Sequence, residues 1–241
     1  MENLKRKQAA LIIDFMHRTI MHHVIWFNEV SERLGLESAY DLLDQAWQRT
    51  YEVQMNRLSK ILGFGMSGDI PEALLEMQTD QIDALIKGAA INWLANDGVW
   101  FQAVEFSTDM TLAKECNDAA WGKFSPFEAH RIKNLLELPK NPGLDGLKRA
   151  LEHRMYAYVN KQSIVDETAN SFIFRMDECR VQRARQRKGL DDYPCKSGGI
   201  IEYTSFAQAV DNRIKTEVVS CPPDPHPESY FCAWRFYIDK N

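Results

Sequence analysis

The chain has 241 residues, of which 45% are hydrophobic and 26% are charged, and its formal net charge is −5. This length allows one sizeable domain or two smaller ones with a substantial core. The acidic balance argues against nucleic acid as a partner, because phosphate binding needs a basic surface. No apolar run reaches the roughly 20 residues that span a bilayer, and the N-terminus lacks the pattern of a secretory signal. We therefore expect a cytoplasmic protein with reduced cysteines, no membrane partner and a small-molecule ligand or substrate.

The first 160 residues are predicted to form a helical region that contains an internal duplication. Residues 25–62 match residues 99–136 at a constant offset of 74, and no insertion is needed. Two tryptophan pairs, Trp26 with Trp100 and Trp47 with Trp121, keep this separation. The duplication predicts two similar helical units that pack face to face as one layer.

Each copy has the pattern of a helix, a short break and further helix. In the first copy, apolar residues spaced by three and four predict a helix that ends at Gly35, and Ser38 is expected to cap the next one. In the second copy, Asn96–Gly98 is expected to kink or interrupt the helix. Thr111 is expected to cap the following helix, and Ser125–Pro126 to open another.

Residues 161–241 are predicted to form a cysteine-rich α+β region. A helix is expected to begin at Thr204 or Ser205 and to run through Ile214. Elsewhere in this region the chain has runs of β-branched and aromatic residues, which are typical of strands. Three strands are predicted, at Ser171–Met176, Lys215–Ser220 and Tyr230–Ile238. If the last two strands pair antiparallel, Cys221 and Cys232, which lie on either side of the loop between them, reach the same end of the sheet.

Four of the five cysteines lie in this region, with the spacing C-x15-C-x25-C-x10-C. Such clustering predicts a site for a thiophilic metal, most simply zinc, although the C-x2-C pair typical of zinc sites is missing. His226 is a reserve ligand. Ordinary half-buried thiols, or one reactive thiol beside arginines, are the alternatives. The predicted metal ligands are Cys179, Cys195, Cys221 and Cys232.

Polar residues lie beside the repeated aromatic residues at matched places. His23 and Asp97 are equivalent under the offset of 74 and precede Trp26 and Trp100 by one turn. Core packing is the simplest interpretation of the aromatic residues. Buried polar side chains need partners, however, so we also predict a ligand pocket here that opens toward the sheet. Glu105, one turn further along, is a candidate acid or base.

A basic run extends from Arg180 to Lys188. A solvated face explains most of it, whereas Arg185 is predicted to bind a substrate carboxylate or phosphate in bidentate fashion. Arg183, Arg185 and Arg187 would share a face if the run were a strand.

The chain contains a set of motifs around these residues, namely Asp97-Gly-Val-Trp-Phe101, Trp121, Cys179-x2-Gln182-x2-Arg185, Pro194-Cys-Lys196 and Cys221-Pro-Pro-Asp224 followed by Cys232-Ala-Trp-x-Phe236. With these motifs the chain resembles a family of cytosolic proteins of anaerobic bacteria and archaea related to L-2-amino-thiazoline-4-carboxylic acid hydrolase, an enzyme that opens a sulfur-containing ring. The C-terminal half is similar to 4-vinyl reductase domains, which are small-ligand-binding α+β modules. The resemblance covers most of the chain, and its C-terminal motif is the more specific.

The sequence as a whole predicts an α+β protein in which a duplicated helical layer packs on a small C-terminal antiparallel sheet. The resemblance implies a metal- or thiol-assisted hydrolase that acts on a small heterocyclic or sulfur-containing carboxylic acid. The alternative is a sensor module that takes a small ligand into the aromatic pocket and holds a structural metal.

Overall fold

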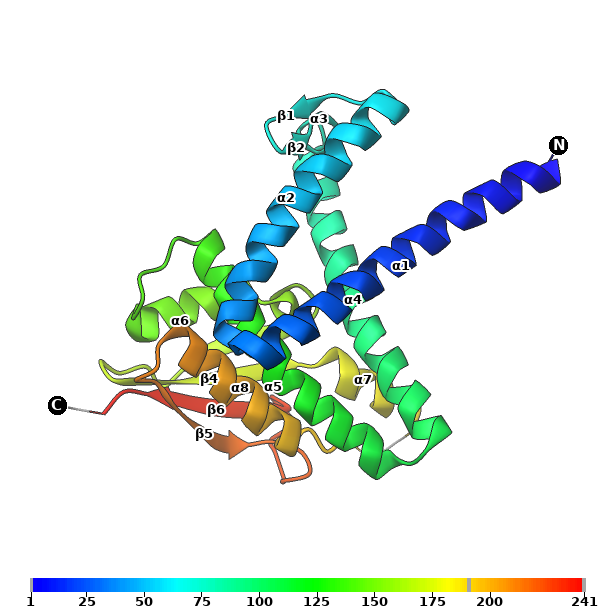
Figure 1. Ribbon diagram of the computed structural model, residues 1–241. Coiled ribbons are helices and arrows are strands. Elements are labelled where there is room, and N and C mark those ends of the chain that lie inside the picture. The colour runs from blue at the N-terminus through cyan, green and yellow to red at the C-terminus, as the bar shows by residue number, and fades with distance from the viewer. Residues whose placement is uncertain (1, 190–191, 240–241) are drawn as a thin grey trace. The chain divides into compact units, whose positions relative to one another are not determined.

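The computed structural model describes residues 2–189 and 192–239 and has the predicted α+β fold (Figure 1). The strands are β1 (Met66–Ser67), β2 (Ile70–Pro71), β3 (Lys161–Val165), β4 (Ser171–Glu178), β5 (Lys215–Ser220) and β6 (Cys232–Tyr237). The helices are α1 (Glu2–Leu34), α2 (Leu36–Leu62), α3 (Glu72–Leu75), α4 (Thr79–Ser107), α5 (Met110–Leu135), α6 (Gly143–Glu152), the 3-10 helix η1 (Met155–Tyr158), α7 (Arg180–Gln186) and α8 (Lys196–Val210).

The chain divides into two compact units between Met77 and Gln78. Helices α1, α2 and α3 and the small β1–β2 hairpin belong to the first unit, and all later elements belong to the second. The change from helix to strand does lie near residue 160, because β3 begins at Lys161. The compact division lies earlier because α4 and α5 share one core with α8 and the sheet.

The internal duplication corresponds to two helical hairpins with the same break. Gly35, with a positive φ of 81°, separates α1 from α2. Asp109, its equivalent at the offset of 74, precedes α5 and caps it by accepting a 2.9 Å hydrogen bond from the Leu112 N–H. Face-to-face packing of the two copies stays a prediction.

Several predicted helix boundaries are wrong. Ser38 does not cap the second helix, because α2 begins at Leu36 directly after Gly35, and Thr111 does not cap α5, because Asp109 does. Helix α4 continues through Asn96–Gly98, and α5 is capped by Asp109 and continues through Pro126. Pro126 removes one backbone hydrogen bond, but α5 packs against both α4 and α8 there.

Helix α8 begins at Lys196 and ends at Val210. Its two early glycines belong to the helix instead of forming a loop, and a Cβ at Gly198 would meet Asp118 of α5, whereas one at Gly199 would meet Trp234 of β6.

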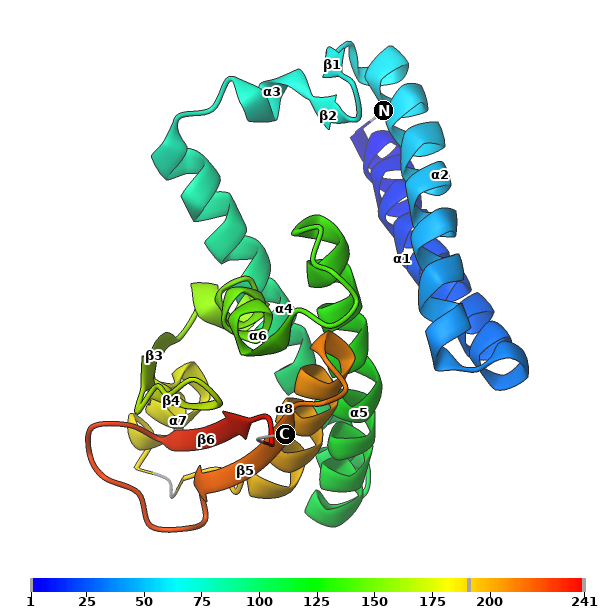
Figure 2. The same ribbon diagram turned by 90° about the vertical axis from the view of Figure 1, so that its left-hand side faces the viewer.

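The second unit contains a four-stranded antiparallel sheet with the strand order β3-β4-β6-β5. Strands β4, β5 and β6 are the three that the sequence predicts, and β5 pairs with β6 antiparallel as expected. Helix α8 lies between this sheet and α5 (Figures 1 and 2). Aromatic residues of β4 and β6 pack on the apolar face of α8, and this contact forms the core. The core residues at this contact include Phe172, Phe174, Trp234, Phe236, Tyr203, Phe206 and Val210.

Within the described residues, no helix is both long and apolar enough to cross a membrane.

Candidate functional site

The second unit encloses a cavity of about 490 Å³ that contains most of the predicted functional residues. Its walls come from α4, α5, η1, α7, α8 and the ends of β5 and β6. All four C-terminal cysteines line it. A cavity of this size is suited to a small molecule.

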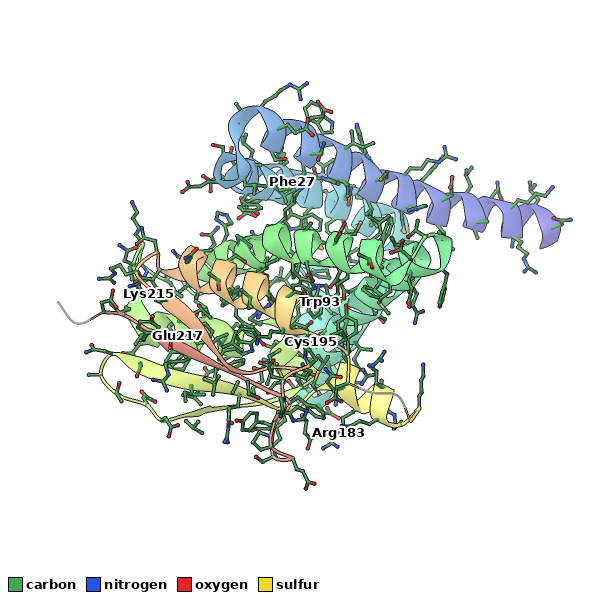
Figure 3. The ribbon with its side chains drawn as sticks, turned by 90° about the horizontal axis from the view of Figure 1, so that it is seen from below. Phe27, Trp93, Arg183, Cys195, Lys215 and Glu217 are labelled. Carbon is green, nitrogen blue, oxygen red and sulfur yellow. The ribbon has the colours of Figure 1, made fainter. Side chains whose placement is uncertain are left out.

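Strand ends explain why the four thiols meet. Cys179 follows β4, Cys221 follows β5, Cys232 opens β6 and Cys195 immediately precedes α8. Met176 of β4 pairs with Cys232, so the end of β4 and the start of β6 lie together. Figure 3 shows Cys195 at the opposite end of the sheet from Lys215, the first residue of β5.

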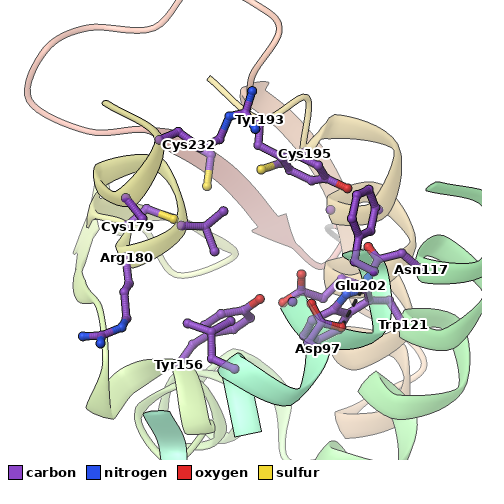
Figure 4. Close-up of a pocket in the computed structure, with 18 of the residues that line it drawn as sticks. Asp97, Asn117, Trp121, Tyr156, Cys179, Arg180, Tyr193, Cys195, Glu202 and Cys232 are labelled. Atoms are coloured by element: carbon purple, nitrogen blue, oxygen red, sulfur yellow. Dashed lines mark hydrogen bonds between the residues drawn. The ribbon is translucent and has the colours of Figure 1, made fainter. Parts of the chain in front are cut away.

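The thiols form one wall of the cavity. In Figure 4 the sulfur atoms of Cys179, Cys195 and Cys232 point into a shared space. Burial raises the pKa of Cys179 to about 11 and, together with neighbouring thiols, holds that of Cys195 well above its ordinary value. A hydrogen bond to Cys232 and burial also raise the pKa of Cys221. Cys179, Cys195 and Cys221 are therefore protonated and neutral near pH 7.

The thiols suit a soft metal ion by type but not by placement. Within the described part of the chain, no three His, Cys, Asp or Glu side chains are arranged to hold a metal ion together. A tetrahedral zinc site needs four ligands at about 2.0–2.3 Å from one centre. The sulfur atoms would have to move closer to one another to meet that requirement.

The buried side chain of Gln182 fixes the segment that carries Cys195. Its Nε2 donates to the Tyr193 carbonyl at 2.9 Å and to the Cys195 Sγ at 3.2 Å. Its Oε1 accepts a 2.8 Å hydrogen bond from the Tyr193 N–H. Gln182 therefore uses both its amide nitrogen and its amide oxygen to orient the Cys195 thiol and the backbone of Tyr193.

The carboxyl group of Glu202 lies across the cavity from the thiols (Figure 4). It is 8% exposed, and its Oε1 lies 2.8 Å from the Nη1 of Arg154. Arg154 also donates through Nε to Glu128 at 2.8 Å, so the arginine serves two carboxylates. Burial raises the pKa of Glu202 to about 7, although Arg154 opposes the shift. Glu202 can therefore gain or lose a proton near neutrality.

Asp97 and two aromatic residues complete this wall. Asn117 donates through Nδ2 to the Asp97 Oδ1 at 3.2 Å. Burial raises the pKa of Asp97, and this hydrogen bond partly offsets the effect. Trp121 and Tyr156 stack with ring centroids 5.7 Å apart. Two acidic groups and a phenol thus lie beside an aromatic floor.

Three of the predicted ligand-binding residues line the cavity, namely Asp97, Glu105 and Arg185. Trp100 does not, and 68% of it is exposed. It follows the lining residue Gly98 by two positions, which places it about 200° around the helix. Trp100 therefore points away from this cavity, and its predicted role in ligand binding stays a prediction.

His23 and Trp26 lie on α1, in the first unit. His23 is half-buried and Trp26 is 62% exposed. The described residues that form the cavity all belong to the second unit, so the cavity exists without these two side chains.

The basic run forms a helix, α7, and not a strand. The residues of the run that line the cavity therefore recur at helical spacing. They are Arg180, Ala184, Arg185 and Lys188. Arg183 instead lies over the ring of Phe231, with its guanidinium carbon 5.2 Å from the centroid. The cavity thus has a positively charged side next to its thiol wall.

His226, the reserve ligand, is engaged elsewhere. Its Nε2 lies 2.8 Å from the Asp192 carboxylate and its Nδ1 lies 2.9 Å from the Pro227 carbonyl. Both ring nitrogens therefore have partners away from the thiols.

Sequence reasoning missed several residues of the site. Glu202 carries a signal, because it is the single carboxylate in the apolar run that α8 buries, but the helix was predicted to begin after it. Arg154 is charged and almost fully buried, which no local pattern indicates. The other missed residues are Asn117, Tyr156 and Tyr193.

The fold and the cavity define an α+β protein with a thiol wall, a carboxyl wall and a cationic side around a space for a small molecule. The chain belongs to a family of unknown function (DUF6125), whose model matches residues 2–79 and 75–238. Comparison with curated proteins and with solved structures finds no match for this chain.

Proposed function

We propose that this protein is a hydrolase of a small heterocyclic or sulfur-containing carboxylic acid, and that the reaction takes place in the cavity of the second unit. One observation carries the proposal. A buried carboxyl group whose pKa is about 7, Glu202, faces a wall of thiols across a space of about 490 Å³. A group that titrates near the working pH, placed inside a cleft, is suited to general acid–base catalysis.

The residues around the cavity support a division of roles. Arg185, with Arg180 beside it, holds the substrate carboxylate on the cationic side. The neutral thiols contact the sulfur or the ring of the substrate, because sulfur is soft and polarizable. Asp97 and its partner Asn117 hydrogen-bond polar ring substituents.

Glu202 is the base and then the acid in the proposed reaction. It takes a proton from a water molecule, whose oxygen adds to the carbon of a ring C=N bond. The π electrons of the C=N bond move to the ring nitrogen, which takes the second proton of the water as the C–OH group becomes C=O. Glu202 then gives its proton to the other ring heteroatom as the bond from that atom to the carbon breaks and the ring opens. Water is consumed, and no electron donor or acceptor is needed. Cys179 and Cys195 are less suitable as nucleophiles, because their raised pKa values keep these two thiols protonated near pH 7.

The proposed metal ion is zinc, and its proposed ligands are Cys179, Cys195, Cys221 and Cys232. The type of ligand supports it, whereas the present separation of the sulfur atoms does not. A catalytic role for the ion would require an open coordination position, and a structural role a closed one. No step of the proposed reaction depends on it.

Turnover of 2-aminothiazoline-4-carboxylate by the purified protein tests the proposal. We expect ring opening in the wild type, and a loss of about 10²–10⁴-fold in kcat for Glu202→Gln, which keeps the shape but not the proton exchange. Glu152→Gln, an exposed glutamate on α6, is the control and should retain full activity. Equal rates in wild type and Glu202→Gln would refute the assigned role.

The aromatic lining supports a second function, a 4-vinyl-reductase-like module that senses a small ligand. Phe101, Trp121, Tyr156, Tyr203 and Trp234 all line the cavity, and such surfaces bind apolar molecules without chemistry. Calorimetric binding of the same compound without turnover would favour this function over the hydrolase.

A further inference from the structure

Two of the four thiols differ from the others because they form a pair. Ser220 of β5 pairs with Ala233 of β6, so the next residues outward, Cys221 and Cys232, lie opposite each other. The Cys221 thiol is hydrogen-bonded to Cys232. Opposite residues on antiparallel strands have Cα atoms about 4.5–5.5 Å apart, within the range of about 4.4–6.8 Å that a disulfide requires.

The backbone around the pair is held in place on both sides. The Phe231 N–H donates to the Met176 carbonyl at 2.9 Å, next to Cys232. The Lys196 N–H donates to the Pro222 carbonyl at 2.9 Å, next to Cys221, and the Asp224 N–H donates to the carbonyl of Cys221 itself at 2.9 Å. A bond between the two sulfur atoms would therefore join strands that already have fixed positions.

The two sulfur atoms differ in access. Cys221 is 1% exposed, whereas Cys232 is half-buried and its sulfur points into the cavity (Figure 4). Access and thiolate chemistry decide which sulfur reacts first. Cys232 is therefore the more accessible of the two sulfur atoms to a molecule in the cavity.

We propose that Cys221 and Cys232 are a reversible redox pair that reacts with a small disulfide in the cavity. This activity is separate from hydrolysis and does not depend on it.

The reaction proceeds by two exchanges. The sulfur of Cys232 attacks one sulfur of the small disulfide, whose S–S bond breaks, and the first small thiol leaves with the proton of Cys232. Cys221 then attacks the mixed disulfide at Cys232, and the second small thiol leaves with the proton of Cys221. The small disulfide gains two electrons and two protons, which the protein loses.

Oxidation of the purified protein by oxidised glutathione tests this pair. All samples carry Cys116→Ser, because Cys116 is exposed and would react by itself. The protein is purified without chelator and first reduced with a phosphine. We expect a loss of two titratable thiols, a mass decrease of two hydrogen atoms, and a peptide map that links Cys221 to Cys232. A thiol reductant should reverse all three.

Single variants separate the roles of the two sulfur atoms. Cys221→Ser should stop at a stable glutathione adduct on Cys232, and Cys232→Ser should leave Cys221 unmodified. The parent protein, which carries only Cys116→Ser, is the control and should form the link between Cys221 and Cys232. Resistance of all four thiols to oxidation, a link from Cys232 to Cys179 or Cys195, or a persistent adduct on Cys232 while Cys221 is present would each overturn the proposal. Because the readout is thiol chemistry, a failure here leaves the hydrolase proposal standing.

Discussion

Glu202 owes its properties to its surroundings. A carboxylate that is removed from water favours its protonated form, and Arg154 restores only part of the lost stabilisation. Arg154 is itself enclosed by aromatic rings, and its guanidinium carbon lies 4.5 Å from the ring centroid of Phe206. Buried ion pairs of this kind contribute little net stability, but removing one partner leaves an unpaired charge in the core.

We expect the stability of the protein to fall between about pH 4.5 and 7 because of Glu202. Its pKa is about 7 in the folded protein, against an ordinary value of 4.5. Over that window the unfolded chain loses the proton first, so the free energy of unfolding decreases as pH rises. At 1.36 kcal/mol per pH unit the change amounts to roughly 3 kcal/mol.

Urea denaturation at several pH values measures this dependence. Glu202→Gln cannot ionise, so its stability should vary less over the same window, whereas Glu152→Gln should follow the wild type. The same slope in wild type and Glu202→Gln would show that Glu202 does not titrate there.

At the scale of elements, the contact of α8 with the sheet decides the position of the site. Gly199, in the first turn of α8, lies under the indole of Trp234, and a Cβ at this position would be 2.6 Å from the Cζ2 atom. The glycine lets the start of the helix approach β6 closely. It thereby brings Cys195, which immediately precedes α8, and Glu202, which lies within α8, to the same cavity.

We expect Gly199→Ala to destabilise the protein by about 1–3 kcal/mol, because the indole or the helix must shift. Gly88→Ala is the matched control, since nothing lies within 4 Å of a Cβ at this position in α4. It should be neutral or stabilise by up to about 1 kcal/mol. Urea midpoints measure both, and equal effects of the two variants would contradict the close approach.

Strands were easier to predict than helices in this chain. The run Lys215–Ser220 corresponds to β5 without change, because β-branched residues bounded by turn residues are a local signal. The ends of α4, α5 and α8 were misplaced, because Gly98, Pro126 and Gly198–Gly199 locally favour breaks. Packing overrides this preference, and packing is not visible in a window of sequence.

At the scale of the whole molecule, the two units differ in how much they bury. Among residues 3–77, only Ala39 and Tyr40 are buried. The second unit holds the sheet, its aromatic core and the cavity. The two stretches matched by the family model also meet at residues 75–79, beside the division at Met77.

A fragment of residues 78–241 should therefore fold alone and unfold cooperatively in urea. A fragment of residues 1–77 should show only marginal helix content at micromolar concentration, because isolated helices without a core are weakly stable. Circular dichroism of the two fragments checks both expectations. A non-cooperative 78–241 fragment would show that its core depends on the first unit.

By itself, the sequence determined the α+β class, the repeat of residues 25–62 at 99–136, the end of the first helix at Gly35, and three strands of the sheet. It also singled out the four C-terminal cysteines, because composition and offset are properties of the chain alone. Only the tertiary structure decided that Cys221 and Cys232 form a pair, and that Glu202 faces the thiols with its pKa near 7. Proximity and burial arise between residues far apart in the chain, so no local pattern encodes them.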